Sequence, residues 1–176
     1  MRIITADQRK AIGKFFDDMR NAAQENFERD GCCVPVALLL RDEGPAAVPL
    51  QPFLSDKDLA SAVLNQAIEA THPLAFVLVT EAWLASKEDH PDADLLEKFQ
   101  GQLATPAPGG GQQPKAGVRE SVILICSAVT GENFLLTAEI VRSEGSKPSL
   151  KPWARQDTAG AKGRFLFDVT PLAERQ

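Results

Sequence analysis

Two apolar runs separated by a short turn sequence constrain the fold of this chain more than any other stretch. They lie in VRESVILICSAVTGENFLLTAEIVR, residues Val118–Arg142, and are rich in β-branched residues. Thr130-Gly131-Glu132-Asn133 lies between them, and Gly and Asn accept the left-handed backbone angles that a tight connection needs. We therefore predict a β-hairpin with strands over 118–129 and 134–141.

Two helices are predicted before this hairpin. Thr5 and Gln8 have capping-box spacing and open the first helix, which Asp30-Gly31 ends. The second helix runs from Asp56 to about Thr71 with Ser55 as its cap, and it stops before Pro73. The first helix has one apolar stripe, formed by Ile12, Phe15, Phe16, Met19, Ala23 and Phe27.

Further strands are predicted from alternation and from apolar runs. Cys32–Arg41 alternates, and Pro35 places it at an edge or marks its beginning. Leu74–Ala85 is apolar on both faces for half its length, which favours a central position. Asp42–Leu54 contains three prolines and is predicted to be a loop, and Arg164–Thr170 a last strand. We expect an α+β, two-layer fold, with an about five-stranded, largely antiparallel sheet and two main helices on one face.

Size and composition indicate one soluble globular domain over residues 1–176. The chain is 44% apolar and 24% charged with a formal charge of −5, which disfavours a chain-wide nucleic-acid binder. No run reaches the length of a membrane-spanning helix, and MRIITADQRK lacks the apolar core of a signal peptide. Three cysteines do not make a disulfide framework. We therefore predict a cytoplasmic protein with no membrane partner.

Residues 86–117 form an unusually long connection within this domain, which we predict to be partly mobile. Its first part is acidic, and carboxylate oxygens suit hard cations. The candidate metal ligands are Glu88, Asp89, His90 and Asp92, with Asp94 close by. Their spacing matches no calcium-loop pattern, so the main interpretation is a solvated acidic segment. No metal or cofactor is assigned.

Glu81 and Glu120 are the candidate catalytic residues. Glu81 ends the apolar part of one predicted strand, and Glu120 begins the first strand of the hairpin. If these strands are neighbours the two carboxylates converge, and paired carboxylates bind metal or perform acid–base chemistry. In the alternative, Glu81 reaches solvent or pairs with an arginine, and Glu120 forms a surface ion pair beside Arg119.

A basic segment follows the hairpin. Residues 142–164 hold six basic and two acidic side chains, with Trp153 in the middle. Lys and Arg interleaved with an aromatic ring can contact phosphate and stack on a base. The candidate nucleic-acid-binding residues are Lys147, Lys151, Trp153 and Arg155. In the alternative, the segment is a solvated loop whose Trp153 packs on the sheet.

One resemblance rests on two short stretches, Glu81-Ala82-Trp83 and Arg119-Glu120-Ser121-Val122. A strand ending in Glu-Ala-Trp, a polar loop with prolines and an apolar strand led by Arg-Glu resemble uncharacterised small bacterial and phage-encoded proteins. The resemblance covers roughly a quarter of the chain, implies no activity and transfers no catalytic residue.

Three functions follow from these observations. We expect a non-enzymatic binding or structural module, with a homodimer formed through the mixed face of 134–141 as a possible arrangement. The first alternative is a divalent-cation-dependent, hydrolase-type enzyme using Glu81 and Glu120. The second is a nucleic-acid-associated protein using the segment 142–164.

Overall fold

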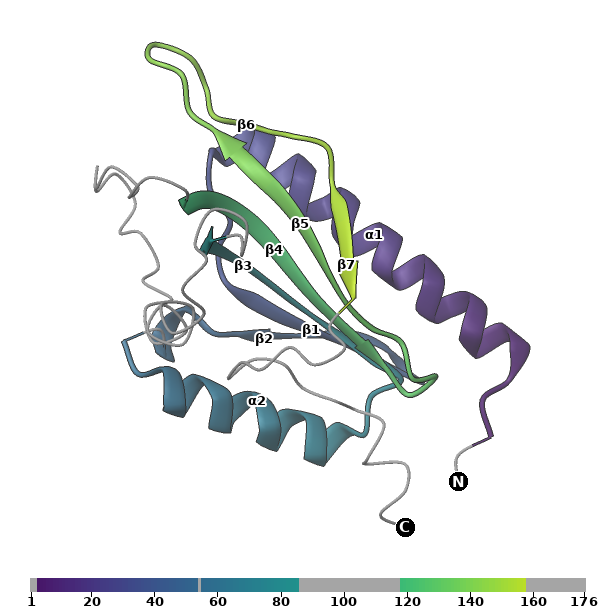
Figure 1. Ribbon diagram of the computed structural model, residues 1–176. Helices are drawn as coiled ribbons and strands as arrows, with labels where there is room; N and C mark the ends of the chain where they lie inside the picture. Colours follow the sequence, from purple (N-terminus) through teal and green to yellow (C-terminus); the bar gives the residue numbers. More distant parts are fainter. Residues whose placement is uncertain (1–2, 54, 86–117, 158–176) are drawn as a thin grey trace.

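The protein is an α+β fold built on one antiparallel sheet (Figure 1). The computed structural model describes residues 3–53, 55–85 and 118–157. In that part of the chain seven strands pair in the order β2-β1-β3-β4-β5-β6, and β7 also pairs with β5. The prediction of an α+β antiparallel domain is confirmed, although the expected number of about five strands was too low. The elements are α1 (Ala6–Asp30), β1 (Val36–Arg41), β2 (Gly44–Pro49), the 3-10 turn η1 (Gln51–Phe53), α2 (Lys57–Thr71), β3 (Ala75–Ala85), β4 (Val118–Ala128), β5 (Asn133–Val141), β6 (Ser149–Leu150) and β7 (Ala154–Asp157).

The long helix α1 begins and ends where the sequence indicates. The side chain of Thr5 accepts the N–H of Gln8, and the side chain of Gln8 accepts the N–H of Thr5, which completes the capping box. Gly31 ends the helix with a left-handed φ of 74° and donates its N–H to the carbonyl of Phe27. Five apolar side chains of the predicted stripe are buried: Ile12, Phe15, Phe16, Ala23 and Phe27.

β2 corrects the prediction that Asp42–Leu54 is a loop. It pairs with β1 from Val36↔Pro49 to Arg41↔Gly44, across a two-residue turn. Proline cannot donate a ladder hydrogen bond, which made this stretch look irregular. Among the strands that the structure describes, β2 is the last in the order and pairs with β1 alone, and two prolines are tolerated in a strand at such a position. β1 begins at Val36, directly after Pro35.

β3, β4 and β5 form the centre of the sheet. β3 lies between β1 and β4 and is buried from Ala75 to Val79, as its double-sided apolar pattern predicts. β4 and β5 form the predicted hairpin, in which the turn residue Gly131 has a φ of +88°. This hairpin prediction is confirmed.

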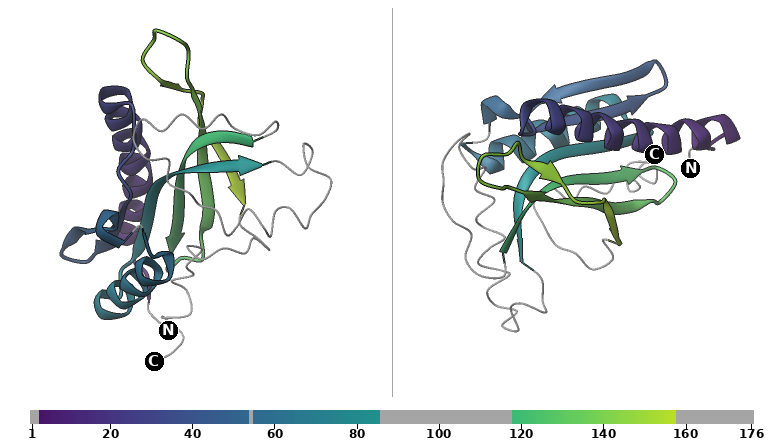
Figure 2. Two further views of the ribbon diagram at one scale, coloured as in Figure 1. Left: turned by 90° about the vertical axis from the view of Figure 1, so that its left-hand side faces the viewer. Right: turned by 90° about the horizontal axis from the view of Figure 1, so that it is seen from above.

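The two helices pack against opposite faces of the curled sheet (Figures 1 and 2). α1 shares a core with Val77, Val79 and the alternate β4 residues Val122, Leu124 and Cys126. α2 shares a second core with the intervening residues Phe76 and Leu78 of β3, through Leu64 and Ile68. The expectation that both helices lie on one face is therefore wrong, because β1 and β3 are apolar on both faces and each face has its own helix.

Two details of α2 follow from local geometry. Asp56, and not Ser55, is its N-cap, because the Asp56 carboxylate accepts the N–H groups of Asp58 and Leu59. His72 ends the helix in the left-handed region with a φ of 43°, immediately before the buried Pro73. No helix in the described part of the chain is long and apolar enough to span a membrane. The predicted strand Arg164–Thr170 lies outside the described residues.

β6 and β7 form one edge strand interrupted by a bulge. β6 pairs as Ile140↔Leu150, whereas β7 pairs as Leu136↔Arg155, so the register changes by one residue between them. The extra residue falls in Lys151-Pro152-Trp153. We call residues 147–157, which contain β6 and β7, the strap. At the bulge, Trp153 turns onto α1, where its Nε1–H donates to Gln24 Oε1 at 2.9 Å.

Candidate functional site

Glu81 is a buried carboxylate on the face of the sheet that α1 covers. It follows Val79 by two positions on β3, so both side chains point to the same face. Only 8% of its surface is exposed. Its Oε1 accepts the backbone N–H of Cys33 at 2.6 Å. The carboxylate therefore ties the connection between α1 and β1, residues 31–35, to the middle of the sheet.

Glu120 lies diagonally across from Glu81 on the neighbouring strand. In the β3–β4 register, Glu81 faces Val122 and Trp83 faces Glu120, so the two glutamates are two positions apart on one face. The negative charge of Glu120 raises the pKa of Glu81. The predicted condition for convergence, that their strands are neighbours, is met.

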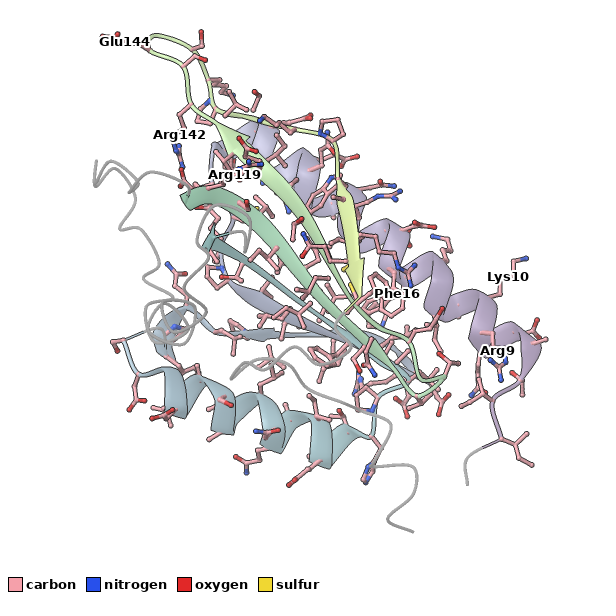
Figure 3. The ribbon with its side chains drawn as sticks, in the orientation of Figure 1. Arg9, Lys10, Phe16, Arg119, Arg142 and Glu144 are labelled. Atoms are coloured by element: carbon pink, nitrogen blue, oxygen red, sulfur yellow. The ribbon has the colours of Figure 1, made fainter. Side chains whose placement is uncertain are left out.

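Arg142 completes this group from the end of β5. Its Nε donates to Glu120 Oε2 and its Nη2 donates to Glu120 Oε1, each at 2.7 Å. The Glu120 side chain is 10% exposed and that of Arg142 is 48% exposed, so the ion pair lies at the margin of the core. Figure 3 shows Arg142 where β5 ends and β4 begins. We call Glu81, Glu120 and Arg142 the carboxylate cluster.

The charges in the carboxylate cluster do not balance. Burial raises the pKa of Glu81, the N–H of Cys33 opposes that rise, the negative charge of Glu120 adds to it and Arg142 lowers it. The hydrogen bonds to Glu120, with the nearby charges of Glu120 and Glu81, raise the pKa of Arg142. The carboxyl groups of Glu81 and Glu120 thus face the single guanidinium of Arg142. Glu81 holds its proton more tightly than an ordinary glutamate.

The three cysteines of the chain have different exposures. Cys32 is exposed, Cys33 is half-buried and Cys126 is buried, and all three are free thiols. Burial, with the nearby charge of Glu81, raises the pKa of Cys33 to about 12. Because the thiolate is the reactive form, Cys33 is a poor nucleophile at neutral pH.

The donor set of the cluster suits packing better than metal binding. Both Glu120 oxygens already accept hydrogen bonds from Arg142, and one Glu81 oxygen accepts the N–H of Cys33. Across residues 3–53, 55–85 and 118–157, no three or more His, Cys, Asp and Glu side chains are grouped to hold a metal ion. The candidate ligands Glu88, Asp89, His90 and Asp92 lie outside the described residues, and so does Asp94.

The four candidate nucleic-acid residues each contact this chain. Lys147 Nζ donates to the carbonyls of Glu28 and Arg29 at the end of α1, at 3.4 and 3.0 Å, and Lys151 Nζ pairs with Glu139 at 2.8 Å. Trp153 is half-buried against α1, and the Arg155 guanidinium lies 3.8 Å from the centre of the Phe134 ring. These contacts fix the strap on the sheet and on α1. Nucleic-acid binding stays a prediction that no contact tests.

Sequence reasoning proposed that Glu81 and Glu120 converge if their strands are neighbours, but it missed their partners. Arg142 was counted within the basic segment, although it lies two positions after Ile140 on the α1 face. That spacing was a usable signal, because alternation along 134–141 extends to residue 142. The Cys33 N–H had no signal, since a backbone donor is the same at every residue other than proline.

Comparisons of this chain with protein-family models, with curated proteins and with solved structures give no match. The resemblance to small bacterial and phage-encoded proteins therefore stays a prediction. Any function must be argued from the geometry of the carboxylate cluster and the strap.

Proposed function

We propose that this chain is a non-enzymatic binding or structural module, in which the carboxylate cluster acts as an internal brace. The observation that carries this proposal is the engagement of Glu120 by Arg142 through both carboxylate oxygens. A bidentate guanidinium of this kind competes with a metal ion for the same oxygens. With the Cys33 contact of Glu81, the cluster joins β3, β4, the end of β5 and the connection from α1.

Thermal melts with and without magnesium, manganese or zinc test this proposal. An ion that binds only the folded protein raises its melting temperature. We expect that the carboxylate cluster binds none of these ions. Any ion-dependent rise in the melting temperature of the wild type should therefore also occur in Glu81→Gln and in Glu120→Gln. The exposed Glu25→Gln is the matched control, because it removes one carboxylate that is not part of the cluster. A rise in the wild type and in the control, absent from both cluster variants, would overturn the proposal.

The alternative is a divalent-cation-dependent, hydrolase-type enzyme using Glu81 and Glu120. One observation favours it, since a buried carboxyl group with a raised pKa is a property of many general acids. The ion-dependent rise described above is the result expected from this enzyme. Hydrolysis of a chromogenic ester or phosphate panel that is lost in Glu81→Gln would support it further.

We also propose that the module is cytoplasmic and forms a homodimer. The three cysteines are free thiols, which suits a reducing compartment and supports the cytoplasmic location. The mixed face of β5, where Leu135 and Glu139 are partly exposed and Thr137 is buried, is the surface that the dimer would use. Light scattering over a range of protein concentrations tests the dimer, and a mass that stays at one chain throughout counts against it.

A further inference from the structure

We propose that the apolar run at residues 165–169, which follows β7, packs onto the sheet around Ile123 and supplies a second layer there. The occupant is thus a segment of this same chain, and the surface is the part of the sheet face opposite α1 that α2 does not cover. This inference does not depend on the proposed function, because a brace and an enzyme could both contain it.

The surface is a group of buried side chains that the two cores leave out. Ala82 and Ile123 project from the face opposite α1 and are 1% and 6% exposed. Among the described residues, neither belongs to the core under α1 or to the core under α2. Ser121 and Thr137, beside them on the same face, are also buried. We call Ala82, Ser121, Ile123 and Thr137 the Ile123 face.

Burial of this kind needs a second layer. Neighbours within a sheet cover the flanks of a side chain, whereas a layer packed about 10 Å above the sheet covers its end. The core under α2 reaches Ile125 on this face, and at the far edge Ala154 and Gln156 of β7 are exposed. The second layer therefore lies over β3, β4 and the inner side of β5. Leu135 and Glu139, on the proposed dimer surface, are partly exposed, which leaves room for a second copy there.

The chain that follows β7 is long enough to reach the Ile123 face. β7 ends at Asp157, which is paired with Phe134, and residues 158–176 follow it outside the described residues. Phe165 comes eight positions after Asp157, and eight extended residues span about 26 Å. Ile123 lies two strands from β7 and three positions along β4 from the partner of Phe134, which is about 10 Å in each direction.

The side chains of the run match those of the surface. Phe165, Phe167 and Val169 alternate with Leu166 and Asp168, so an extended segment presents two phenyl rings on one side. The Ile123 face surrounds one isoleucine with alanine, serine and threonine. Large rings fill the space above such small side chains, as interdigitated layers require.

Thiol labelling of the full-length protein tests whether the run covers this face. Thr137→Cys introduces a thiol of nearly the same size, in a Cys32→Ser background that removes the exposed native thiol. We expect slow labelling, which becomes about tenfold faster or more when Phe165→Ala and Phe167→Ala are added. Asp168→Ala, on the other side of the run, is the matched control and should leave the rate unchanged. Labelling that is fast from the start, or that the two phenylalanine changes do not alter, would overturn the proposal.

Disulfide trapping decides the question if loss of both rings unfolds the protein. Thr137→Cys is combined in turn with Phe165→Cys and with Phe167→Cys, and each protein is oxidised at low concentration. Because a disulfide needs Cβ atoms within about 4.5 Å, we expect a bond within the chain in at least one of them and none with Asp168→Cys. No such bond in either protein would overturn the proposal. A bond between chains would contradict it as well, because a second copy would then cover the face.

Discussion

The backbone N–H of Cys33 donates a hydrogen bond to Glu81 Oε1 at 2.6 Å, between residues 48 positions apart in the chain. This contact joins the end of the first helix to the middle of the sheet. Beside it, Arg142 closes a bidentate ion pair on Glu120. The carboxylate cluster thus links segments that lie far apart in the sequence, which is why we interpret it as a brace.

The first prediction concerns Arg142. In Arg142→Gln, the largely buried Glu120 loses its cation while it still faces Glu81. We expect a loss of about 1–3 kcal/mol in the free energy of unfolding, measured with denaturant at neutral pH. Lys14→Gln is the control, since it breaks an exposed pair with Asp18 within α1 and should cost no more than about 0.5 kcal/mol.

A double variant separates the ion pair from general damage. Glu120→Gln with Arg142→Gln removes both charges together, so its cost should be smaller than the sum of the two single costs. The difference measures the coupling between the two side chains. Additive costs would show that Arg142 and Glu120 do not stabilise one another in the folded protein.

The second prediction concerns the strap. Trp153→Phe removes the N–H that donates to Gln24 and keeps an aromatic ring, so it should cost about 1 kcal/mol. Trp153→Ala also removes the packing of this half-buried ring on α1 and should cost about twice as much or more. Denaturant unfolding measures both.

Gln24→Ala is the matched partner of this series. It removes the acceptor of the same hydrogen bond from the α1 side, so its effect should resemble that of Trp153→Phe. If Trp153→Ala costs no more than Trp153→Phe, the ring does not pack on α1 in solution. Trp153 would then again be a candidate for contact with a base.

The third prediction concerns pH. The folded-state pKa of Glu81 lies above its ordinary value of 4.5, and the largest cause is the burial of its carboxylate. Its contribution to stability is therefore fully present below the ordinary value and is lost as the pH rises through the folded-state pKa. Since other carboxylates titrate in the same region, the measured quantity is the difference in unfolding free energy between Glu81→Gln and the wild type. We expect this difference to grow as the pH rises, and a constant difference would contradict the raised pKa.

Much of the fold could be predicted because local patterns and packing agree. The capping box at Thr5, the stop at Gly31 and the turn at Gly131 are each fixed by a few neighbouring residues. The central place of β3 followed from apolar side chains on both of its faces. These features need no knowledge of distant contacts, so the sequence alone was sufficient for them.

The features that were missed depend on distant contacts. β2 is a strand despite Pro45 and Pro49, because its pairing with β1 stabilises an extended conformation that its own residues favour only weakly. The bulge near Pro152 appears only in the pairing with β5. The placement of α2 was wrong because a strand with two apolar faces does not say which helix covers which face.

The candidate site was predictable in its acids and not in its partners. Glu81 and Glu120 could be proposed because two carboxylates on adjacent strands stand out in apolar surroundings. Whether they meet solvent, metal or protein depends on Arg142 and on the Cys33 backbone, which come from other elements. Lys147 and Lys151, which looked like a basic patch in the sequence, likewise have partners on other elements. Lys147 donates to the carbonyl of Arg29 on α1, and Lys151 pairs with Glu139 on β5.

Unfolding free energies of Glu81→Ala and Glu81→Gln at neutral pH test the brace most directly. Alanine leaves the Cys33 N–H without its acceptor, and we expect a loss of about 1–3 kcal/mol. Glutamine keeps an oxygen for that N–H and removes the buried charge, so we expect stability equal to or above that of the wild type. If alanine is harmless, or if glutamine is as damaging as alanine, Glu81 is not a brace held through its hydrogen bond.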